Sequence, residues 1–323
     1  MKFTKMHGCG NDYIYIDCFK ESLPEDPGAL KDLIVRLSDR HFGIGGDGVI
    51  LIDRGRKAPF EMRMYNADGS YSKMCGNGIR CVAKYLWDNG YIDPSTVLPD
   101  ENAAAGGTYF AEFGIESGGE VKKIRLALSD GKDGKKEVRS VTVNMGPAIL
   151  DPEKIPVRIP GFPGRVPEAV KEIPGNGKAP LVLGVPIQVG GREFKMTCVS
   201  MGNPHAVVFL DELPDDEMMK KFGPLFETHE YFPEKVNTEF VLVKDRHRVR
   251  MRVWERGTGE TLACGTGTCA VTVAAILNGY CESPVTVEVT GGEVTDAWDR
   301  EKNEVFMTGP AVTVFEGETL ISR

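Results

Sequence analysis

The sequence predicts an α+β protein made of two pseudo-symmetric, duplicated domains, each a mostly antiparallel sheet or barrel wrapped around a central helix. The first observation is a repeated motif, Cys75-Gly-Asn-Gly78 in one half and Cys264-Gly-Thr-Gly267 in the other, 189 residues apart. The second is that the same offset superposes a Met-Arg pair upstream of each Cys and an Asn-Gly-Tyr triplet downstream. Chance similarity does not keep register over about thirty residues, so we infer an internal duplication.

The length and charge of the chain narrow its class. At 323 residues the chain is long enough for two domains. Its 47 acidic and 39 basic residues give a net charge of −8 without any basic tract, which argues against nucleic acid or an anionic membrane as a partner. The most apolar helical stretch, residues 269–277, is far shorter than the roughly 20 residues that span a bilayer. No apolar signal core follows the first residues, so we expect a cytoplasmic protein.

The eight cysteines do not form the pattern of a disulfide framework, and they suit a reducing compartment. No Cys-x-x-Cys pair occurs, and the pairs Cys75/Cys81 and Cys264/Cys269 have spacings that point to different sides of a helix. We therefore expect no metal site.

In the first half, apolar residues at helical spacing predict an amphipathic helix over residues 29–41 and a second helix that starts at Gly76 and ends at Gly90. Residues 1–17 are predicted to form a strand, a tight turn at 7–12 and a second strand at 13–16. The polar run 130–137 is predicted to be a turn or a domain linker, with the second half beginning at the strand 141–145. Further strands are predicted at residues 49–52, 61–66, 108–116 and 122–128.

Residues 43–48 read Gly-Ile-Gly-Gly-Asp-Gly and formally match the dinucleotide-binding motif. That motif needs a strand before it and a helix after it, because the pyrophosphate binds the N-terminus of the following helix. Here the order is reversed, with a predicted helix before the glycines and a predicted strand after them. A glycine-rich turn is the better interpretation.

In the second half, eight of the 20 prolines fall between Pro152 and Pro186, which predicts loops and edge strands there. The helix 268–278 is apolar on nearly every side and is therefore expected to be buried. A weaker echo of the first half relates Gly10-Asn11 to Gly202-Asn203, the latter in a tight turn beside His205. Strands are predicted at residues 195–199, 206–210, 240–243, 248–254, 285–289, 304–307 and 312–315.

The repeated cysteine motif has a specific chemistry. A Cys that starts a helix lies among unpaired backbone N–H groups at the positive end of the helix dipole, which lowers a thiol pKa from ~8.5 into the ~3.5–7.5 range. The following glycines let a ligand approach the backbone, and the same N–H groups bind carboxylates. A lone Cys at this position is more often a small buried hydrophobe, but two copies in register favour a functional pair.

Two opposed thiols suit inversion at a carbon that carries an acidic hydrogen. One thiolate removes the proton from one face, and the other thiol returns a proton to the opposite face. Hydrogen-bond donors directed at the substrate carboxylate stabilise the intermediate carbanion. We therefore expect Cys75 and Cys264 to face one another across a cleft between the domains. The other cysteines and His7, His41, His229 and His247 are expected to be structural, and His205, beside Asn203, is the exception.

Together these motifs make the chain closely resemble the diaminopimelate epimerases, which are cofactor-independent amino-acid racemases. The resemblance covers essentially the whole chain and rests on the segments 7–12, 42–47, 65–69, 74–80, 202–205, 237–239 and 254–267. Met-Cys-Gly alone would indicate only the wider superfamily, which includes proline racemase-like enzymes. The resemblance implies interconversion of LL- and meso-diaminopimelate, on the route to lysine and peptidoglycan, without any cofactor.

The resemblance also assigns roles to residues. It implies that Cys75 and Cys264 are the acid/base thiols, and that His205 and Glu255 tune them. Backbone N–H groups of Gly76-Asn77 and Gly265-Thr266 would bind the reacting carboxylate. Arg256 would bind the distal carboxylate through its planar fork, while Glu255 would also meet the α-ammonium group. The remaining substrate contacts would be Asn11, Asn66, Asn203 and Asn237.

The Glu255-Arg256 pair is the best specificity signal, because racemases of monocarboxylic amino acids have no second charged end to bind; the alternative is a surface ion pair. Gly48 stands where some family members have Gln, and the stretch 152–186 is longer than the family leads us to expect. We expect a first domain of residues 1–138 plus 312–323, with the terminal strand returning to it, and a second domain of 139–311. A homodimer is possible.

Two alternatives remain open. A related racemase or isomerase of another amino acid would keep the thiol pair and change the substrate contacts. A non-catalytic binding protein would use the two thiols as a redox switch.

Overall fold

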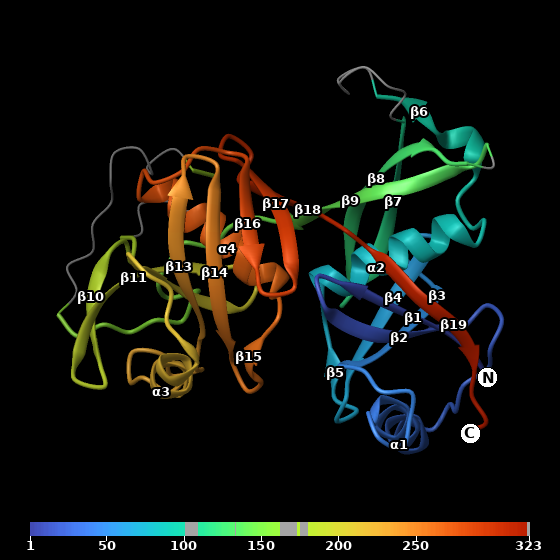
Figure 1. Cartoon of the computed structure of the whole chain (residues 1–323), viewed down its shortest axis with the longest axis horizontal. Helices are drawn as coiled ribbons and strands as arrows, with labels where there is room; N and C mark the ends of the chain where they lie inside the picture. The colour runs from blue at the N-terminus through green and yellow to red at the C-terminus, as the bar shows by residue number, and fades with distance from the viewer. Residues whose placement is uncertain (101–108, 133, 162–172, 175–179, 322–323) are drawn as a thin grey trace. The chain divides into compact units, whose positions relative to one another are not determined.

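The computed structural model describes residues 1–100, 109–132, 134–161, 173–174 and 180–321. The chain divides into two compact units (Figure 1), one of Met1–Asn144 with Thr308–Arg323 and the other of Met145–Met307. Within the described residues each unit is a mostly antiparallel sheet with two α-helices, so the α+β class is confirmed. The first division lies inside a strand, after Asn144, rather than in the turn that precedes this strand.

The first unit is one ladder of strands around α2 (Gly76–Asp88). The strands follow the order β19-β1-β2-β3-β4-β7-β8-β9, antiparallel except for the pairs β2–β3 and β4–β7. The short strands β5 and β6 pair with β4 and β7. The elements of this ladder are β1 (Lys2–Gly8), β2 (Asn11–Asp17), β3 (Gly48–Arg54), β4 (Phe60–Asn66), β5 (Tyr71–Ser72), β6 (Leu98–Pro99), β7 (Tyr109–Ser117), β8 (Glu120–Asp130), β9 (Lys136–Gly146) and β19 (Val312–Glu318).

The second unit repeats this order around α4 (Gly265–Leu277). Its strands run β10-β11-β12-β13-β14-β16-β17, again antiparallel except for two pairs, β12–β13 and β14–β16. β15 pairs with β14 as β5 does with β4. The elements are β10 (Val185–Val189), β11 (Arg192–Ser200), β12 (Pro204–Phe209), β13 (Asn237–Asp245), β14 (Arg248–Glu255), β15 (Gly259–Thr261), β16 (Val285–Val289), β17 (Gly292–Asp299) and β18 (Glu304–Gly309).

The two ladders match in strand order and in the bounds of their central helices, which confirms the duplication. The offset of 189 maps the first and last residues of α2 onto those of α4. It also maps the pair Val49–Tyr65 of β3 and β4 onto Thr238–Trp254 of β13 and β14. In each unit the position next to the first strand of the repeat is filled by one more strand: β10 beside β11, and the chain's last strand, β19, beside β1. The return of the terminal strand to β1 is what the family resemblance implies.

In each unit a helix connects the strands of the first parallel pair, β2–β3 in one and β12–β13 in the other. α1 (Pro27–Ser38) begins at Asp26, whose carboxylate accepts the N–H of Ala29 at 2.8 Å, and it ends before Asp39. The predicted helix 29–41 is therefore displaced toward the C-terminus, because capping by Asp26 and a Pro in the first turn set the start. α1 buries Leu33, Ile34 and Leu37 against β2 and β3.

The helix of the second unit, α3 (Asp216–Glu227), was not predicted. Asp215 caps it by accepting the N–H of Met218 at 2.8 Å, and Met219, Phe222 and Phe226 are buried at helical spacing. Pro224 lies in the last turn, where it hides the helical pattern from a reader of the sequence. Gly223 lies under the Trp254 ring, and a Cβ there would come within 2.3 Å of it.

Several other predictions need correction. The stretch predicted as a turn or domain linker at 130–137 belongs to the β8–β9 hairpin instead, because Asp130 ends β8 and pairs with Lys136, the first residue of β9. His205 lies in β12 and only Met201–Asn203 forms the turn before it. The helix predicted at 268–278 starts three residues earlier, at Gly265, as the duplication requires. Strands β5, β6, β10, β15 and β17 were missed. Of the proline-rich stretch, residues 151–161 are irregular, and residues 162–172 and 175–179 lie outside the described residues.

Both central helices are buried for a reason visible in their sequences. In α4, every residue from Gly267 to Ala275 is buried, as its apolar composition predicts.

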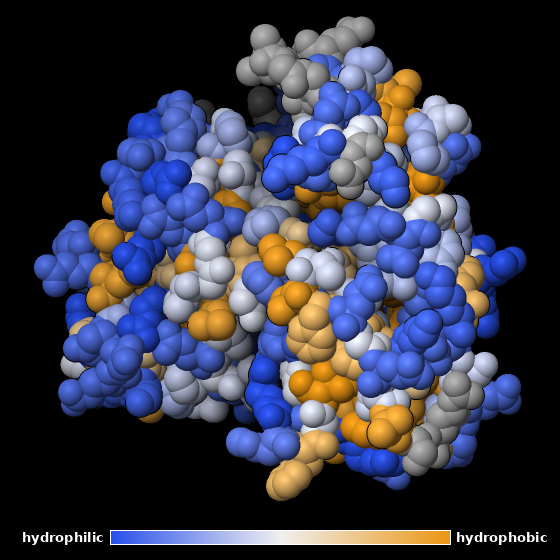
Figure 2. Space-filling view, turned by 45° about the vertical axis from the view of Figure 1, so that its right-hand side comes forward, coloured by the Kyte–Doolittle hydropathy of each residue, from blue (hydrophilic) through white to orange (hydrophobic). Residues whose placement is uncertain are grey.

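Polar and apolar side chains are interspersed over the face shown in Figure 2. Among the described residues no helix is long and apolar enough to cross a membrane.

Candidate active site

Cys75 is the N-cap of α2. Its backbone is extended, with φ −140° and ψ 115°, and its sulfur accepts the N–H of Gly78 at 3.3 Å. The thiol donates to Oδ1 of Asn11, 3.3 Å away on β2. The first half-site therefore joins the start of β2 to the start of α2.

Asn11 has a fixed amide orientation. Its Nδ2 donates to Asp47 at 2.7 Å, so its Oδ1 faces Cys75 and also accepts from Nδ2 of Asn77 at 3.4 Å. Asn77 is itself held by Arg80, which is fully buried and donates to Oδ1 of Asn77 at 2.9 Å. Asp47 and Arg80 lie inside the motif segments, and the sequence interpretation gave them no role, although their side chains hold Asn11 and Asn77.

Gly78 lets α2 start against the sheet. A Cβ at this position would lie 2.5 Å from Cδ1 of Ile50 on β3 and 3.6 Å from the Cys75 sulfur. We expect Gly78→Ala to destabilise the protein by about 1–3 kcal/mol, since overpacking a closed core costs this much. Ile50→Val removes the clashing methyl and should restore part of the loss in the double variant. Urea unfolding of the four proteins measures the coupling, and simple additivity would contradict this explanation.

Cys264 is the N-cap of α4 and is 5% exposed. Its sulfur lies 3.5 Å from the hydroxyl of Thr266. Burial raises the pKa of this thiol well above its ordinary value, and the carboxylates of Glu255 and Glu239 raise it further. The Thr266 hydroxyl and the Gly267 N–H oppose this rise without reversing it. The prediction that a helix start lowers the thiol pKa is therefore wrong for Cys264, because burial and two nearby carboxylates outweigh the helix dipole.

A pH dependence follows from this shift. Because the pKa of Cys264 is raised, the folded protein holds it as the neutral thiol at neutral pH, and the thiolate forms only at alkaline pH. An unfolded thiol ionises at about 8.5, so Cys264 lowers the free energy of unfolding as the pH rises past that value. Cys264→Ser, with an alcohol that does not ionise there, should lose less stability than the parent between about pH 8 and 10. Equal losses in urea titrations over this range would contradict the assignment.

A continuous set of contacts leads from Cys264 into the core of the second unit. Thr266 Oγ1 lies 3.3 Å from Nδ2 of Asn203, and Oδ1 of Asn203 lies 3.1 Å from Nε2 of His205. Nδ1 of His205 lies 2.7 Å from Oε1 of Glu239, and neither His205 nor Glu239 is exposed. The structure thus brings together Cys264, Thr266, Asn203 and His205, which the sequence interpretation selected, and adds Glu239, to which it gave no role.

Glu255 is the last residue of β14, and Arg256 follows it. Glu255 accepts a hydrogen bond from the hydroxyl of Thr261, and its charge reaches the Cys264 thiol. The exposed Arg256 donates Nη1 to the carbonyl of Glu234 at 2.9 Å, and its backbone N–H donates to Oδ1 of Asn237 at 2.9 Å. Among the ion pairs of the described residues, none joins Glu255 to Arg256, so the alternative of a surface ion pair is not what the structure shows.

The remaining predicted contacts lie at strand ends. Asn237 is buried, starts β13 and donates to the carbonyl of Pro204 at 2.9 Å. Asn66 ends β4 and donates to the hydroxyl of Ser70 at 2.9 Å. Gly48 has φ 158°, and a Cβ there would lie 2.0 Å from the carbonyl oxygen of Tyr65. A side chain such as Gln at this position would therefore require a different backbone.

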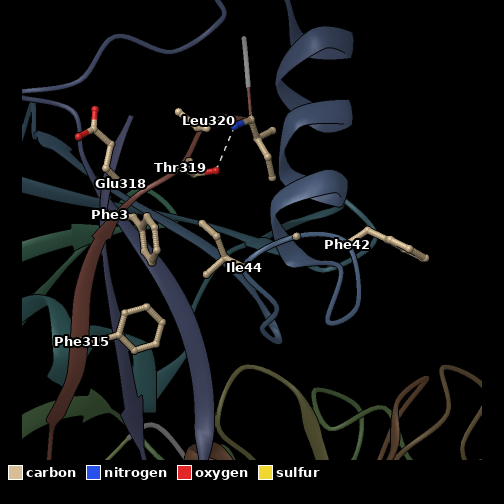
Figure 3. Close-up of a pocket in the computed structure, with 9 residues that line it drawn as sticks. Phe3, Phe42, Ile44, Phe315, Glu318, Thr319 and Leu320 are labelled. Atoms are coloured by element: carbon tan, nitrogen blue, oxygen red, sulfur yellow. Dashed lines mark hydrogen bonds between the residues drawn. The ribbon is translucent and has the colours of Figure 1, made fainter.

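A surface pocket in the first unit contains none of the predicted site residues. Figure 3 shows it between the C-terminal strand and the loop after α1, with apolar walls from Phe3, Ile44 and Phe315. Phe42 and Leu320, also in its lining, are 90% and 98% exposed. Within the described part of the chain, no three His, Cys, Asp or Glu side chains are grouped as metal ligands.

Solved structures share this architecture. A probable proline racemase from Agrobacterium radiobacter K84 is 13% identical with a TM-score of 0.64, over 99% of this chain and 93% of the other. A hydroxyproline epimerase from Agrobacterium vitis is 14% identical with a TM-score of 0.63, over 98% and 90% of the two chains. At such identities the likeness concerns the fold. It places the chain in a fold class of two duplicated α+β domains that a probable proline racemase and a hydroxyproline epimerase share.

Sequence comparison makes the assignment specific. The family model for diaminopimelate epimerase matches residues 3–103 and 197–314. The diaminopimelate epimerase of Agathobacter rectalis is 47% identical over 98% of this chain and 99% of its own length. That of Acetivibrio thermocellus is 45% identical over 98% of both. The chain belongs to the diaminopimelate epimerase family and is an isomerase.

Proposed function

We propose that this protein interconverts LL- and meso-2,6-diaminopimelate, a step in lysine and peptidoglycan biosynthesis, with Cys75 and Cys264 acting on opposite faces of one carbon. Membership of the family supports the reaction. The observation that supports the two-thiol mechanism is that both sulfurs occupy the same N-cap position of matched helices in duplicated units. A single base would tend to return the proton to the face from which it came.

The proposed reaction is a pair of proton transfers. One cysteine, as thiolate, takes the α-hydrogen and becomes a thiol, and the C–H electron pair stays on the α-carbon. The other cysteine, as thiol, donates its proton to the opposite face and becomes the thiolate. No electrons leave the system, so no oxidant is required. Each reaction direction uses the opposite assignment of acid and base.

The carbanion needs stabilisation at the substrate carboxylate. We assign this to the N–H groups of Gly76-Asn77 and Gly265-Thr266, which begin the two helices, because such groups bind anions and act most strongly on charge that develops in the transition state. Glu255, close to Cys264, would meet the α-ammonium group and assist proton transfer at that thiol. Arg256 would bind the distal carboxylate. Asn11, Asn66, Asn203 and Asn237 would hold the substrate.

We further propose that the reaction needs no pyridoxal phosphate, because the two thiols and the N–H groups supply both the proton transfers and the stabilisation of charge. Full activity after treatment with a carbonyl reagent such as hydroxylamine is expected, and loss of activity that added pyridoxal phosphate restores would contradict it. The eight cysteines form no disulfide, which suits a cytoplasmic location, and a homodimer is a further proposal that sedimentation would test.

Racemisation of another amino acid is a second candidate, because the solved structures of the same fold include a probable proline racemase and a hydroxyproline epimerase by name. Exchange of the α-hydrogen in deuterium oxide, measured over a panel of amino acids, separates the two candidates. We expect exchange with diaminopimelate and none with proline or hydroxyproline. Exchange with another amino acid alone would overturn the proposed substrate.

Oxidation of the two thiols separates the catalytic proposal from a non-catalytic redox switch. If the two sulfurs flank one carbon, mild oxidation should join Cys75 to Cys264 and abolish activity, and a thiol reductant should restore it. Peptide mapping identifies the disulfide bond, and a thiol titration should show two fewer reactive thiols after oxidation. A disulfide-bonded protein with full activity would refute the catalytic role of both cysteines.

A further inference from the structure

The two half-sites share a fold and differ in what lies behind each cysteine. Ile14 lies opposite Val49 in β2–β3, and Ala206 lies opposite Thr238 in β12–β13, so the matched positions are fixed by strand register. By this register Asn11 corresponds to Asn203, Tyr13 to His205 and Ile50 to Glu239. The first unit thus has a phenol and an apolar side chain where the second has an imidazole and a carboxyl group.

We propose that Glu239 is a positioning residue that fixes the proton of His205 on Nε2, and so sets the direction of every hydrogen bond from His205 to Cys264. The effect on catalysis rests on the proposed function, whereas the position of the proton rests only on the contacts of Glu239 and His205. Glu239 and His205 are both fully buried and 2.7 Å apart.

Charge balance decides where the proton lies. A carboxylate beside a neutral imidazole that donates from Nδ1 would leave one net negative charge buried, which is costly without further donors. Among the described residues Oε2 of Glu239 has no hydrogen-bond partner, and Glu255 adds a like charge nearby. Burial also raises the pKa of Glu239, which favours its protonated form. Both net-neutral forms, carboxylic acid with imidazole and carboxylate with imidazolium, carry the proton on Nε2.

The rest of the chain of contacts follows from that proton. Nε2–H donates to Oδ1 of Asn203 at 3.1 Å, so the Nδ2 group of Asn203 faces Thr266. The Thr266 oxygen accepts from this amide, which leaves its own hydrogen for the sulfur of Cys264, 3.5 Å away. Every donor in this series of hydrogen bonds therefore points toward Cys264. The donors favour the thiolate of Cys264, whereas its burial favours the neutral thiol.

The first unit shows the opposite arrangement. Asp47 takes the Nδ2 group of Asn11, so Asn11 offers an acceptor to Cys75 and favours the neutral thiol. Two matched asparagines are thus held in opposite amide orientations. If Glu239 only supported the fold, it would not need to fix one amide orientation of Asn203 through His205.

The close approach of α4 to Glu239 fits this role. A Cβ on Gly267 would lie 2.8 Å from Oε1 of Glu239 and 3.3 Å from the sulfur of Cys264. The helix start therefore packs directly on the carboxyl group. At the matched Gly78 the corresponding neighbour is a methyl group of Ile50.

The test is a two-bond proton–nitrogen NMR spectrum of the full chain labelled with ¹⁵N-histidine, in which His205→Gln assigns the signal among the five histidines. We expect protonated Nε2 on His205 in the wild type. Glu239→Gln should keep it, because a Gln N–H can donate to Nδ1, whereas Glu239→Leu should lose the single form. His229 is the internal control, because its Nδ1 accepts the Tyr231 N–H at 3.2 Å and Glu239 does not touch it.

Kinetics give the second readout. Glu239→Leu should lower kcat about ten- to a hundred-fold with KM nearly unchanged, which is the scale for losing the partner that orients a functional histidine, and Glu239→Gln should recover most of it. A wild-type His205 that is neutral with its proton on Nδ1 would overturn the proposal. So would a Glu239→Leu protein with an unchanged spectrum and kcat. If Glu239→Leu does not fold, the wild-type spectrum and Glu239→Gln decide.

The outcomes also separate this inference from the proposed function. The expected His205 spectrum in a protein that exchanges no α-hydrogen of diaminopimelate would reject the function and keep the hydrogen-bond chain. Normal epimerisation with the Nδ1 form of His205 would reject the chain and keep the function.

Discussion

Cys75→Ala and Cys264→Ala should each lower kcat for epimerisation by about 10²–10⁴-fold, the usual contribution of a positioned acid or base, and the double variant should be little worse than either single one. The reason is that each turnover needs both a base on one face and an acid on the other. Losing either stops inversion even if the remaining thiol still exchanges protons on its own face. Formation of meso-diaminopimelate from the LL isomer measures the loss.

A matched control separates chemistry from stability. Cys18 is a half-buried thiol of the first unit, and burial raises its pKa to about 11. Cys18→Ala makes the same atomic change outside the proposed site and should leave kcat within about twofold, as expected for substitutions that touch no functional feature. A Cys75→Ala or Cys264→Ala protein that turns over as fast as Cys18→Ala would refute the two-thiol mechanism.

Arg256→Leu should lower kcat/KM for diaminopimelate by about ten- to a hundred-fold, since a hydrogen bond to a charged group is worth about 1.5–3 kcal/mol. Nη1 of this exposed guanidinium donates to the carbonyl of Glu234, and that bond orients the side chain. A planar fork can bind a carboxylate through two parallel bonds, so Arg256→Lys should recover only part of the loss.

The control for this variant is Arg246→Leu, which removes another exposed arginine of the second unit. Arg246 pairs with Glu282 on the surface and should have little effect on kinetics. Steady-state rates with both isomers test the series. Equal effects of Arg256→Leu and Arg246→Leu, or full recovery by Lys, would show that Arg256 does not bind the distal carboxylate.

Much of the fold and the site was accessible from the sequence, because duplication fixes register. The offset that aligned Cys75 with Cys264 also relates the two helices, whose first and last residues match at that offset in the structure, although the second start was predicted three residues late. Residues within quoted motifs, such as Asn203, Thr266 and His205, do lie together beside Cys264. The repeated cysteine motif could be recognised because its flanking residues extend over about thirty positions and occur in both halves of the chain.

What the sequence did not reveal depends on packing and charge in three dimensions. α3 was missed because its Pro224 hides a helix that Asp215 caps and Phe226 anchors. The pKa direction of Cys264 was wrong, since the burial of the sulfur and its distance from two carboxylates do not show in a Cys-Gly-x-Gly motif. Asp47 and Glu239 were quoted without roles, because their partners Asn11 and His205 lie more than thirty residues away in the chain.

The most direct measurement is the fate of the α-hydrogen during a single passage from LL- to meso-diaminopimelate in deuterium oxide. Two thiols on opposite faces predict that early product carries one solvent deuterium at the inverted carbon, while unreacted LL isomer still carries its original hydrogen. Early product that keeps the hydrogen of the substrate would show one base acting on both faces, and the central claim would then be wrong.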